Sequence, residues 1–123
     1  MEILILMLIC HVLDDFVFQP VILSKLKQKK TWEGLDDQYA DDYKMALFIH
    51  SLSWSCMIML PFVLLSLIQN NVSDITFVSV LLVNTGIHYY VDDLKANKLK
   101  INLCTDQFVH LFQIFATFLI LYS

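Results

Sequence analysis

The sequence predicts an all-α protein: a four-helix transmembrane bundle of up-down topology, with a polar site near its cytosolic side. Hydrophobic residues make up 58% of the 123 residues and charged residues only 16%, whereas about a quarter of a typical soluble domain is charged. The mean hydropathy is +0.64. Glycine and proline occur twice each, which favours long helices over turn-rich β structure. The length suits one domain, so residues 1–123 are expected to form a single integral membrane domain.

Four apolar segments predict the helices, at about residues 2–19, 44–69, 74–94 and 105–122. The second has no charged residue between Met45 and Ile68, a length of about 36 Å as a helix, which is enough to cross a bilayer. The other three are near the lower limit of length, and each carries acidic residues toward one end. The first lacks a basic start and a small-residue cleavage site, so we expect it to be retained rather than removed as a signal peptide.

All eight basic residues are lysines, and they fall in two of the loops between the segments. Because cytosolic loops of membrane proteins are rich in lysine and arginine, we expect an integral protein of the inner (cytoplasmic) membrane with both lysine-bearing loops cytosolic and both termini outside. The stretch VILSKLKQKK is expected to lie along the membrane surface as an amphipathic extension. The lysines are Lys25, Lys27, Lys29, Lys30 and Lys44 in the first loop, and Lys95, Lys98 and Lys100 in the second.

Each apolar segment carries one histidine, and the four are expected at a common depth. Neighbouring helices of such a bundle run in opposite directions, so a residue late in one segment lies level with a residue early in the next. At 1.5 Å per residue, all four imidazoles fall roughly 8 to 12 Å from the cytosolic helix ends. The histidines are His11, His50, His88 and His110.

Three of these histidines have an aspartate four residues away, which places each pair on one helical face. An ionised aspartate at the centre of a bilayer costs about 2.5–3.5 kcal/mol, so such residues need partners. Imidazole and carboxylate groups from several helices are what a divalent transition metal (Zn, Mn or Fe) requires, and these donors could hold one or two ions. The pairs are His11/Asp15, His88/Asp92 and Asp106/His110.

We therefore predict a metal site with roles for ten residues. Asp106 is predicted to be a catalytic general base, and Lys95 to meet an anionic phosphate. Gln19 and Gln107 are predicted to support the ligands or to face the substrate. The predicted ligands are His11, Asp15, His50, His88, Asp92 and His110.

The polar motifs resemble those of an uncharacterised family of small polytopic membrane proteins found in bacteria and their phages. The family pattern reads H-x3-D-F-x2-Q, a lone H, H-x3-D-x2-K and D-Q-x2-H. It corresponds here to HVLDDFVFQ, His50, HYYVDDLK and DQFVH, which together extend over nearly the whole chain. The resemblance selects Asp15 and Asp92 as the paired carboxylates, so their neighbours Asp14 and Asp93 are expected to be solvated at the headgroup level. It implies no activity.

The leading hypothesis is a membrane-embedded metal-dependent hydrolase that acts on a phosphoester or lipid-derived substrate at the cytosolic leaflet. A looser similarity to membrane-embedded metal-dependent hydrolases, which also place histidine and aspartate near helix ends, favours the same class. A metal would activate water, with Asp106 as the base. The expected partners are the lipid bilayer and a small phosphorylated or lipid substrate, and the sequence leaves open a homo-oligomer. No basic cluster with interleaved aromatic residues suggests nucleic acid.

The competing hypothesis is a non-enzymatic membrane protein. It could be a small transporter, a subunit of a proton path, or a phage factor that binds a host membrane partner. The same polar residues could also form a structural network between helices. Haem ligation by facing histidines is disfavoured, because the adjacent carboxylates would crowd an apolar macrocycle. The serines near His50 are expected to form hydrogen bonds within their helix.

Overall fold

The computed structural model describes residues 2–69 and 74–122, and its described residues are almost entirely helical. The all-α prediction is confirmed, whereas the link at residues 70–73 lies outside the described residues. Two short 3₁₀ turns, Lys29–Thr31 and Asp37–Tyr39, lie in the linker before the second long helix. The α-helices are α1 (Glu2–Val12), α2 (Val21–Leu26), α3 (Asp42–Gln69), α4 (Asp74–Ala96) and α5 (Leu103–Tyr122).

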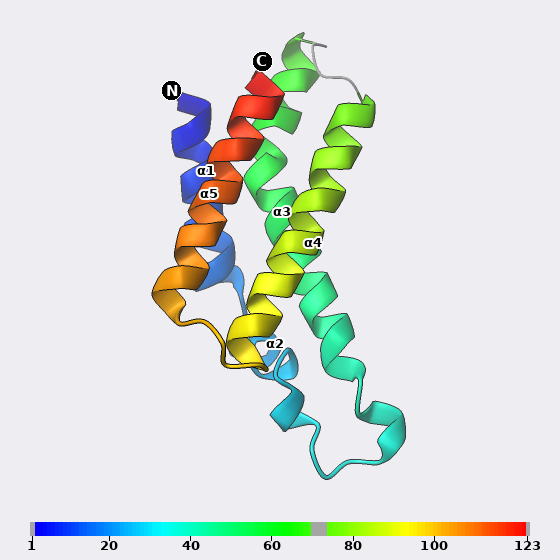
Figure 1. Ribbon diagram of the computed structural model, residues 1–123. Coiled ribbons are helices and arrows are strands. Elements are labelled where there is room, and N and C mark those ends of the chain that lie inside the picture. The colour runs from blue at the N-terminus through cyan, green and yellow to red at the C-terminus, as the bar shows by residue number, and fades with distance from the viewer. Residues whose placement is uncertain (1, 70–73, 123) are drawn as a thin grey trace.

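The four long helices form an up-down bundle in which each helix runs against its neighbour (Figure 1). Helix α1 contacts α3 and α5, while α4 contacts the other sides of α3 and α5. The short helix α2 and the rest of the linker cover one end of the bundle, and the ends of the described chain lie at the opposite end. Because both lysine-bearing loops lie at the α2 end, we call it the lysine end.

The first predicted helix differs most from the structure. Helix α1 ends at Val12 and continues as a wider π-helical turn, Leu13–Phe18. Pro20 follows in an extended conformation and begins α2. A residue that precedes proline is sterically disfavoured from the helical region, which explains why the helix stops before the predicted residue 19.

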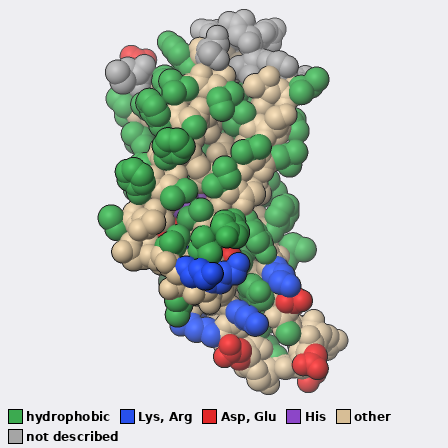
Figure 2. Space-filling model, in the orientation of Figure 1, with side chains coloured by type: hydrophobic (Ala, Val, Ile, Leu, Met, Phe, Trp, Pro, Cys, Tyr) green, Lys and Arg blue, Asp and Glu red, His purple; other side chains and the backbone are tan. Residues whose placement is uncertain are grey.

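The bundle has a buried apolar core and also an apolar outer surface. The core lies away from the lysine end and contains Met7, Trp54, Ile58, Met59, Phe62, Ile114 and Leu121. Large apolar side chains also cover the outside of all four long helices, among them Ile5, Phe48, Leu82 and Phe112. Figure 2 shows this apolar cover over most of one face, with lysine and acidic side chains gathered at the lysine end. An exterior this apolar is typical of a surface that contacts lipid.

Among the described residues, two helical stretches are long and apolar enough to cross a membrane, Asp37–Ser66 and Leu103–Tyr122. Helix α1 is too short for this criterion, with 11 residues, and α4 carries several charged residues near its end. Buried core helices of soluble proteins meet the same criterion, so the four predicted crossings stay a prediction.

Candidate metal centre

The four long helices bring their histidines together in one buried layer. The side chains of His11, His50, His88 and His110 are all buried. The His88 ring stacks on the His110 ring at 4.1 Å between centroids and lies 5.1 Å from the His50 ring. His11 completes the layer with a ring 6.1 Å from that of His110. The layer lies between the apolar core and the lysine end.

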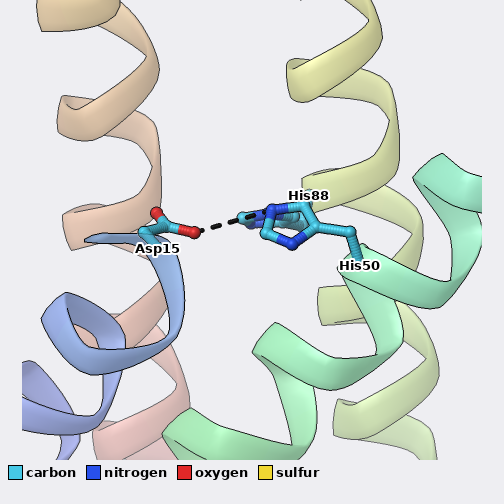
Figure 3. A group of neighbouring side chains, drawn as sticks. All are labelled: Asp15, His50 and His88. Atoms are coloured by element: carbon cyan, nitrogen blue, oxygen red, sulfur yellow. Dashed lines mark hydrogen bonds and ion pairs between the residues drawn. The ribbon is translucent and has the colours of Figure 1, made fainter. Parts of the chain in front are cut away.

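One group of donor atoms consists of Asp15, His50 and His88 (Figure 3). The Nε2 atoms of the two histidines are 3.2 Å apart, and His50 Nε2 lies 3.6 Å from Asp15 Oδ1. Asp92 Oδ2 approaches the same nitrogen of His50 at 3.4 Å. Donors bound 2.0–2.1 Å from a tetrahedral ion lie about 3.3–3.4 Å apart. The distances from His50 Nε2 to His88, Asp15 and Asp92 are close to this separation, and the donor atoms of Asp15, His50 and His88 all lie within 4.8 Å of one another. These residues could therefore hold a metal ion.

A second group consists of His88, Asp92 and His110. Asp92 Oδ1 lies 3.6 Å from His110 Nε2 and 3.9 Å from His88 Nε2. Asp106 adds its Oδ1 atom 3.4 Å from His110 Nε2. Asp92 is thus central, because its two oxygens face different histidines.

Two lysines neutralise part of the negative charge of the centre. Lys27 donates a hydrogen bond to Asp92 Oδ2 at 2.6 Å, and Lys95 donates to Asp106 Oδ2 at 2.5 Å. Lys95 also lies 3.7 Å from Asp92 Oδ1. Four carboxylates therefore face two ammonium groups, so with neutral histidines the centre carries an excess of negative charge that one divalent cation would balance. The carboxylates are those of Asp14, Asp15, Asp92 and Asp106.

Lys27 was not predicted as a site residue. Its stretch was expected to lie along the membrane surface, but the Lys27 side chain turns into the bundle and is buried. The neighbouring Lys25 and Lys29 are exposed. No sequence pattern distinguishes Lys27 from these two, because its position depends on how the linker folds back over the bundle.

His11 belongs to neither donor group. The indole N–H of Trp54 donates to His11 Nδ1 at 2.9 Å, and His11 Nε2 lies 3.2 Å from Gln107 Oε1. Because Nδ1 accepts a hydrogen bond, Nε2 carries the proton and donates it to Gln107. Both ring nitrogens are engaged, so His11 positions its neighbours. Trp54, which the sequence analysis missed, also stacks on His88 at 4.3 Å.

The expectation that Asp14 is solvated is wrong. Asp14 is 5% exposed and accepts a hydrogen bond from Ser53 at 2.9 Å. A π-helical turn winds less per residue than an α-helix, so Asp14 and Asp15 both face the bundle. Asp93 is only partly exposed and pairs with Lys98 at 3.0 Å, a hydrogen bond that raises the pKa of Lys98.

The two predicted glutamines lie beside the charged residues. Gln107 donates to Asp106 Oδ2 at 3.1 Å. With its amide oxygen toward the linker, Gln19 accepts a hydrogen bond from Lys27 Nζ at 2.8 Å. Gln107 thus connects Asp106 with His11, and Gln19 connects Lys27 with the backbone of Asp15.

A cavity of about 390 Å³ connects this centre with the lysine end. It lies between the linker, the π-helical turn, the end of α4 and the start of α5, and it is open to the outside. Its polar lining includes Asp15, Lys27, Lys30, Asp92, Lys95 and Gln107. Of the donor residues, Asp15 and Asp92 line this cavity, together with the two lysines that pair with the carboxylates.

The Ser51 and Ser55 hydroxyls donate to backbone carbonyls of their own helix, as expected, whereas the Ser53 hydroxyl departs from the expectation and donates to Asp14. Of the fourth segment's phenylalanines, Phe108, Phe112 and Phe115 are exposed, while Phe118 packs partly buried against the core. Ser51, Ser55 and these phenylalanines therefore contribute no donors to the centre.

Comparisons with known proteins identify a family but no function. No curated protein and no solved structure matches the chain. One family model, described as "Protein of unknown function (DUF3307)", matches residues 3–123. The match includes every residue of the donor groups, the two lysines and the cavity lining. Because it extends over nearly the whole chain, the protein belongs to this uncharacterised family.

Proposed function

We propose that this protein is a metal-dependent hydrolase embedded in the inner membrane, acting on a phosphoester or lipid-derived substrate at the cytosolic leaflet. One observation carries the proposal: Asp15 and Asp92, which belong to the two groups of imidazole and carboxylate donors, also line a cavity whose other polar residues include three lysines. Binding alone would not require an open cavity beside the donors, whereas hydrolysis requires space for a substrate and for water.

The membrane location rests on the distribution of polarity. All four long helices carry exposed apolar side chains, and every lysine lies at or near one end of the bundle. We propose that the four helices all cross the bilayer, with the lysine end cytosolic and the chain termini outside. The charged end of α4 and the π-helical turn would then lie at the depth of the headgroups, facing the bundle interior.

The metal would be Zn, Mn or Fe, because a mixed set of imidazole and carboxylate donors suits these ions. Asp15, His50, His88 and Asp92 would hold it. When bound, such an ion polarises a phosphoryl or carbonyl oxygen and makes water more acidic. Trp54 stacks against His88 and helps to fix that ring.

The chain's own residues would then bind the substrate and move the proton. Lys95, partly exposed in the cavity, would pair with the phosphate. Asp106 is held through Oδ2 by Lys95 and Gln107, which leaves Oδ1 to accept the proton of the attacking water when one ion is bound. The proton acceptor and the phosphate-binding lysine are thus neighbours.

Metal analysis of the full chain purified in detergent tests this proposal, together with a screen of phosphomonoesters, phosphodiesters and phospholipids. We expect bound transition metal and hydrolysis of at least one substrate class, and loss of both in His50→Gln and His88→Gln. Asp36→Asn, which changes an exposed carboxylate in the linker, should retain both. Metal-free protein whose thermal stability does not respond to added Zn²⁺ or Mn²⁺ would refute the proposal. Bound metal without hydrolysis would favour the non-enzymatic alternative.

A further inference from the structure

Three buried acceptor atoms converge between α4 and α5. His110 Nε2 lies 3.4 Å from Asp106 Oδ1 and 3.6 Å from Asp92 Oδ1. The residues are 0%, 0% and 1% exposed, respectively. We propose that these atoms bind a second divalent cation, so that the centre is binuclear. This inference rests on the proposed function, because it adds a second ion beside the one held by Asp15, His50 and His88.

The tautomer of His110 follows from a chain of hydrogen bonds. Gln113 Nε2 donates to the backbone carbonyl of Asn84 at 3.2 Å. A carbonyl oxygen can only accept, so the amide orientation of Gln113 is fixed and its Oε1 faces His110 Nδ1 at 3.2 Å. His110 Nδ1 must therefore carry a proton. In the neutral ring, the lone pair is then on Nε2 and points toward Asp92 and Asp106.

The chain of hydrogen bonds continues beyond Gln113 and holds His110 and Gln113 in place. Gln113 Nε2 also approaches Asn84 Oδ1 at 3.3 Å, and Asn84 Nδ2 donates to Thr117 Oγ1 at 2.7 Å. All three side chains are buried. A metal-binding histidine commonly donates its other ring N–H to such a partner, which fixes the ring.

Two of the atoms that face each other lack a hydrogen-bond partner. Among the described residues, His110 Nε2 and Asp106 Oδ1 are buried without a hydrogen-bond partner. The donors near Asp106, Lys95 Nζ and Gln107 Nε2, both bind Oδ2. A buried acceptor without a partner costs about 1–3 kcal/mol. A cation bound between these atoms would satisfy both of them at once.

Asp92 connects the two proposed sites. Its Oδ2 faces His50 Nε2 at 3.4 Å, and its Oδ1 faces His110 Nε2 at 3.6 Å. A carboxylate that offers one oxygen to each ion is a common bridge in two-metal hydrolases, where both ions act on one phosphoryl group. With the second ion bound, Asp106 Oδ1 serves as a ligand and no longer accepts the proton.

Charge indicates which substrate suits such a centre. Two divalent ions would reverse the excess negative charge of the four carboxylates and two lysines, leaving the centre positive. A phosphate monoester carries about −1.5 to −2 charge at neutral pH, which restores the balance, whereas a neutral carboxylic ester does not. The binuclear centre therefore favours a phosphate monoester.

The metal content of the full chain in detergent, after loading with Mn²⁺, tests the second site. We expect about two equivalents in the unchanged protein, as in other two-metal sites, with the electron paramagnetic resonance signal of an exchange-coupled pair. Asp106→Asn and His110→Gln should each retain one equivalent and lose the coupled signal. Asp93→Asn is the matched control, because it changes a carboxylate adjacent to Asp92 that pairs with Lys98 instead.

Each outcome separates this inference from the proposed function. The second site would be overturned if the unchanged protein bound only one equivalent, and if that equivalent survived in both Asp106→Asn and His110→Gln but was lost in His50→Gln. The hydrolase proposal would then still stand. No bound metal in the unchanged protein would overturn both. Two coupled ions without hydrolysis of any phosphomonoester, phosphodiester or phospholipid would support the site and refute the enzyme. If the variants do not fold, the coupled signal of the unchanged protein decides.

Discussion

At the scale of single residues, the Lys27–Asp92 ion pair ties the linker to the centre of the bundle. The Lys27 and Asp92 side chains are 8% and 2% exposed, and their charged atoms are 2.6 Å apart. Burying two charges is costly, and the cost is repaid only when both are well paired. Lys27 therefore stabilises Asp92 before any cation binds, and it competes with a cation for Asp92 Oδ2.

Replacing this lysine should weaken the fold and strengthen metal binding. We expect Lys27→Met to lower the free energy of unfolding of the metal-free protein by about 3–5 kcal/mol, because a buried charge loses its partner. The same change should raise the affinity for Zn²⁺ or Mn²⁺, because the centre becomes more negative. Thermal unfolding with and without metal measures both effects, with exposed Lys25→Met as the control. Lower metal affinity in Lys27→Met would contradict this role.

Sequence spacing could predict many of the residues at the centre, but not the role of each one. The four-residue separation of histidine and aspartate places each pair on one helical face, and the opposite directions of the helices bring the pairs together. Spacing cannot show which ring nitrogen faces a donor, so it did not separate His11 from the other histidines. Trp54 looked like an ordinary apolar residue, and only its N–H bond to His11 reveals its role.

At the scale of elements, the π-helical turn Leu13–Phe18 is the feature that shapes the centre most. It is continuous with α1 and directs two consecutive aspartates toward α3, where they approach Ser53 and His50. π-helical turns often occur at functional sites because they redirect side chains locally. Here the turn supplies Asp15 to the first donor group and buries Asp14 beside it.

Shortening this turn should disconnect it from the metal centre. We expect deletion of Leu13 to rotate both aspartates by about one helical position, roughly 100°, and so to remove Asp15 from the donor group. Circular dichroism should still show a helical bundle, while metal analysis should show loss of the ion held by His50 and His88. Deleting Ala40, an exposed linker residue, should leave the metal content unchanged. Full metal content after the Leu13 deletion would contradict the assignment of Asp15.

The helices themselves were predictable because apolar length and terminal charges delimit them. Helices α3, α4 and α5 begin and end within two residues of the ranges expected from sequence. The π-helical turn was not predictable, because its residues are compatible with an ordinary helix and the wider winding is favoured by contacts with α3. The same applies to the linker, whose path depends on the Lys27–Asp92 pair and on the bond from Lys29 N–H to Asn97.

At the scale of the whole molecule, the apolar exterior and the lysine end are the basis of the proposed orientation in the membrane. Side chains such as Leu64, Leu82 and Phe112 are more than half exposed, which is costly in water and favourable in lipid. The lysines lie beside the mouth of the cavity. The proposed topology therefore places the mouth of the cavity on the cytosolic side.

The native cysteines can test this orientation. Cys104 lies exposed at the start of α5 near the lysine end, whereas Cys56 is exposed on α3 in the apolar part of the bundle. We expect a membrane-impermeant maleimide to label Cys104 only after spheroplasts are permeabilised, and to leave Cys56 unlabelled throughout. Variants that retain a single cysteine identify each site. Labelling of Cys104 in intact spheroplasts would reverse the topology, and rapid labelling of Cys56 would refute its contact with lipid.

The position of Asp92 between His50 and His110 has a consequence for how ligands bind together. A cation bound to one Asp92 oxygen withdraws electron density from the other oxygen. The affinity of the other oxygen for a second cation is therefore lower. By thermodynamic reciprocity the penalty is the same in either order. An anion spanning both halves would relieve it, and substrate and metal would then bind with positive cooperativity.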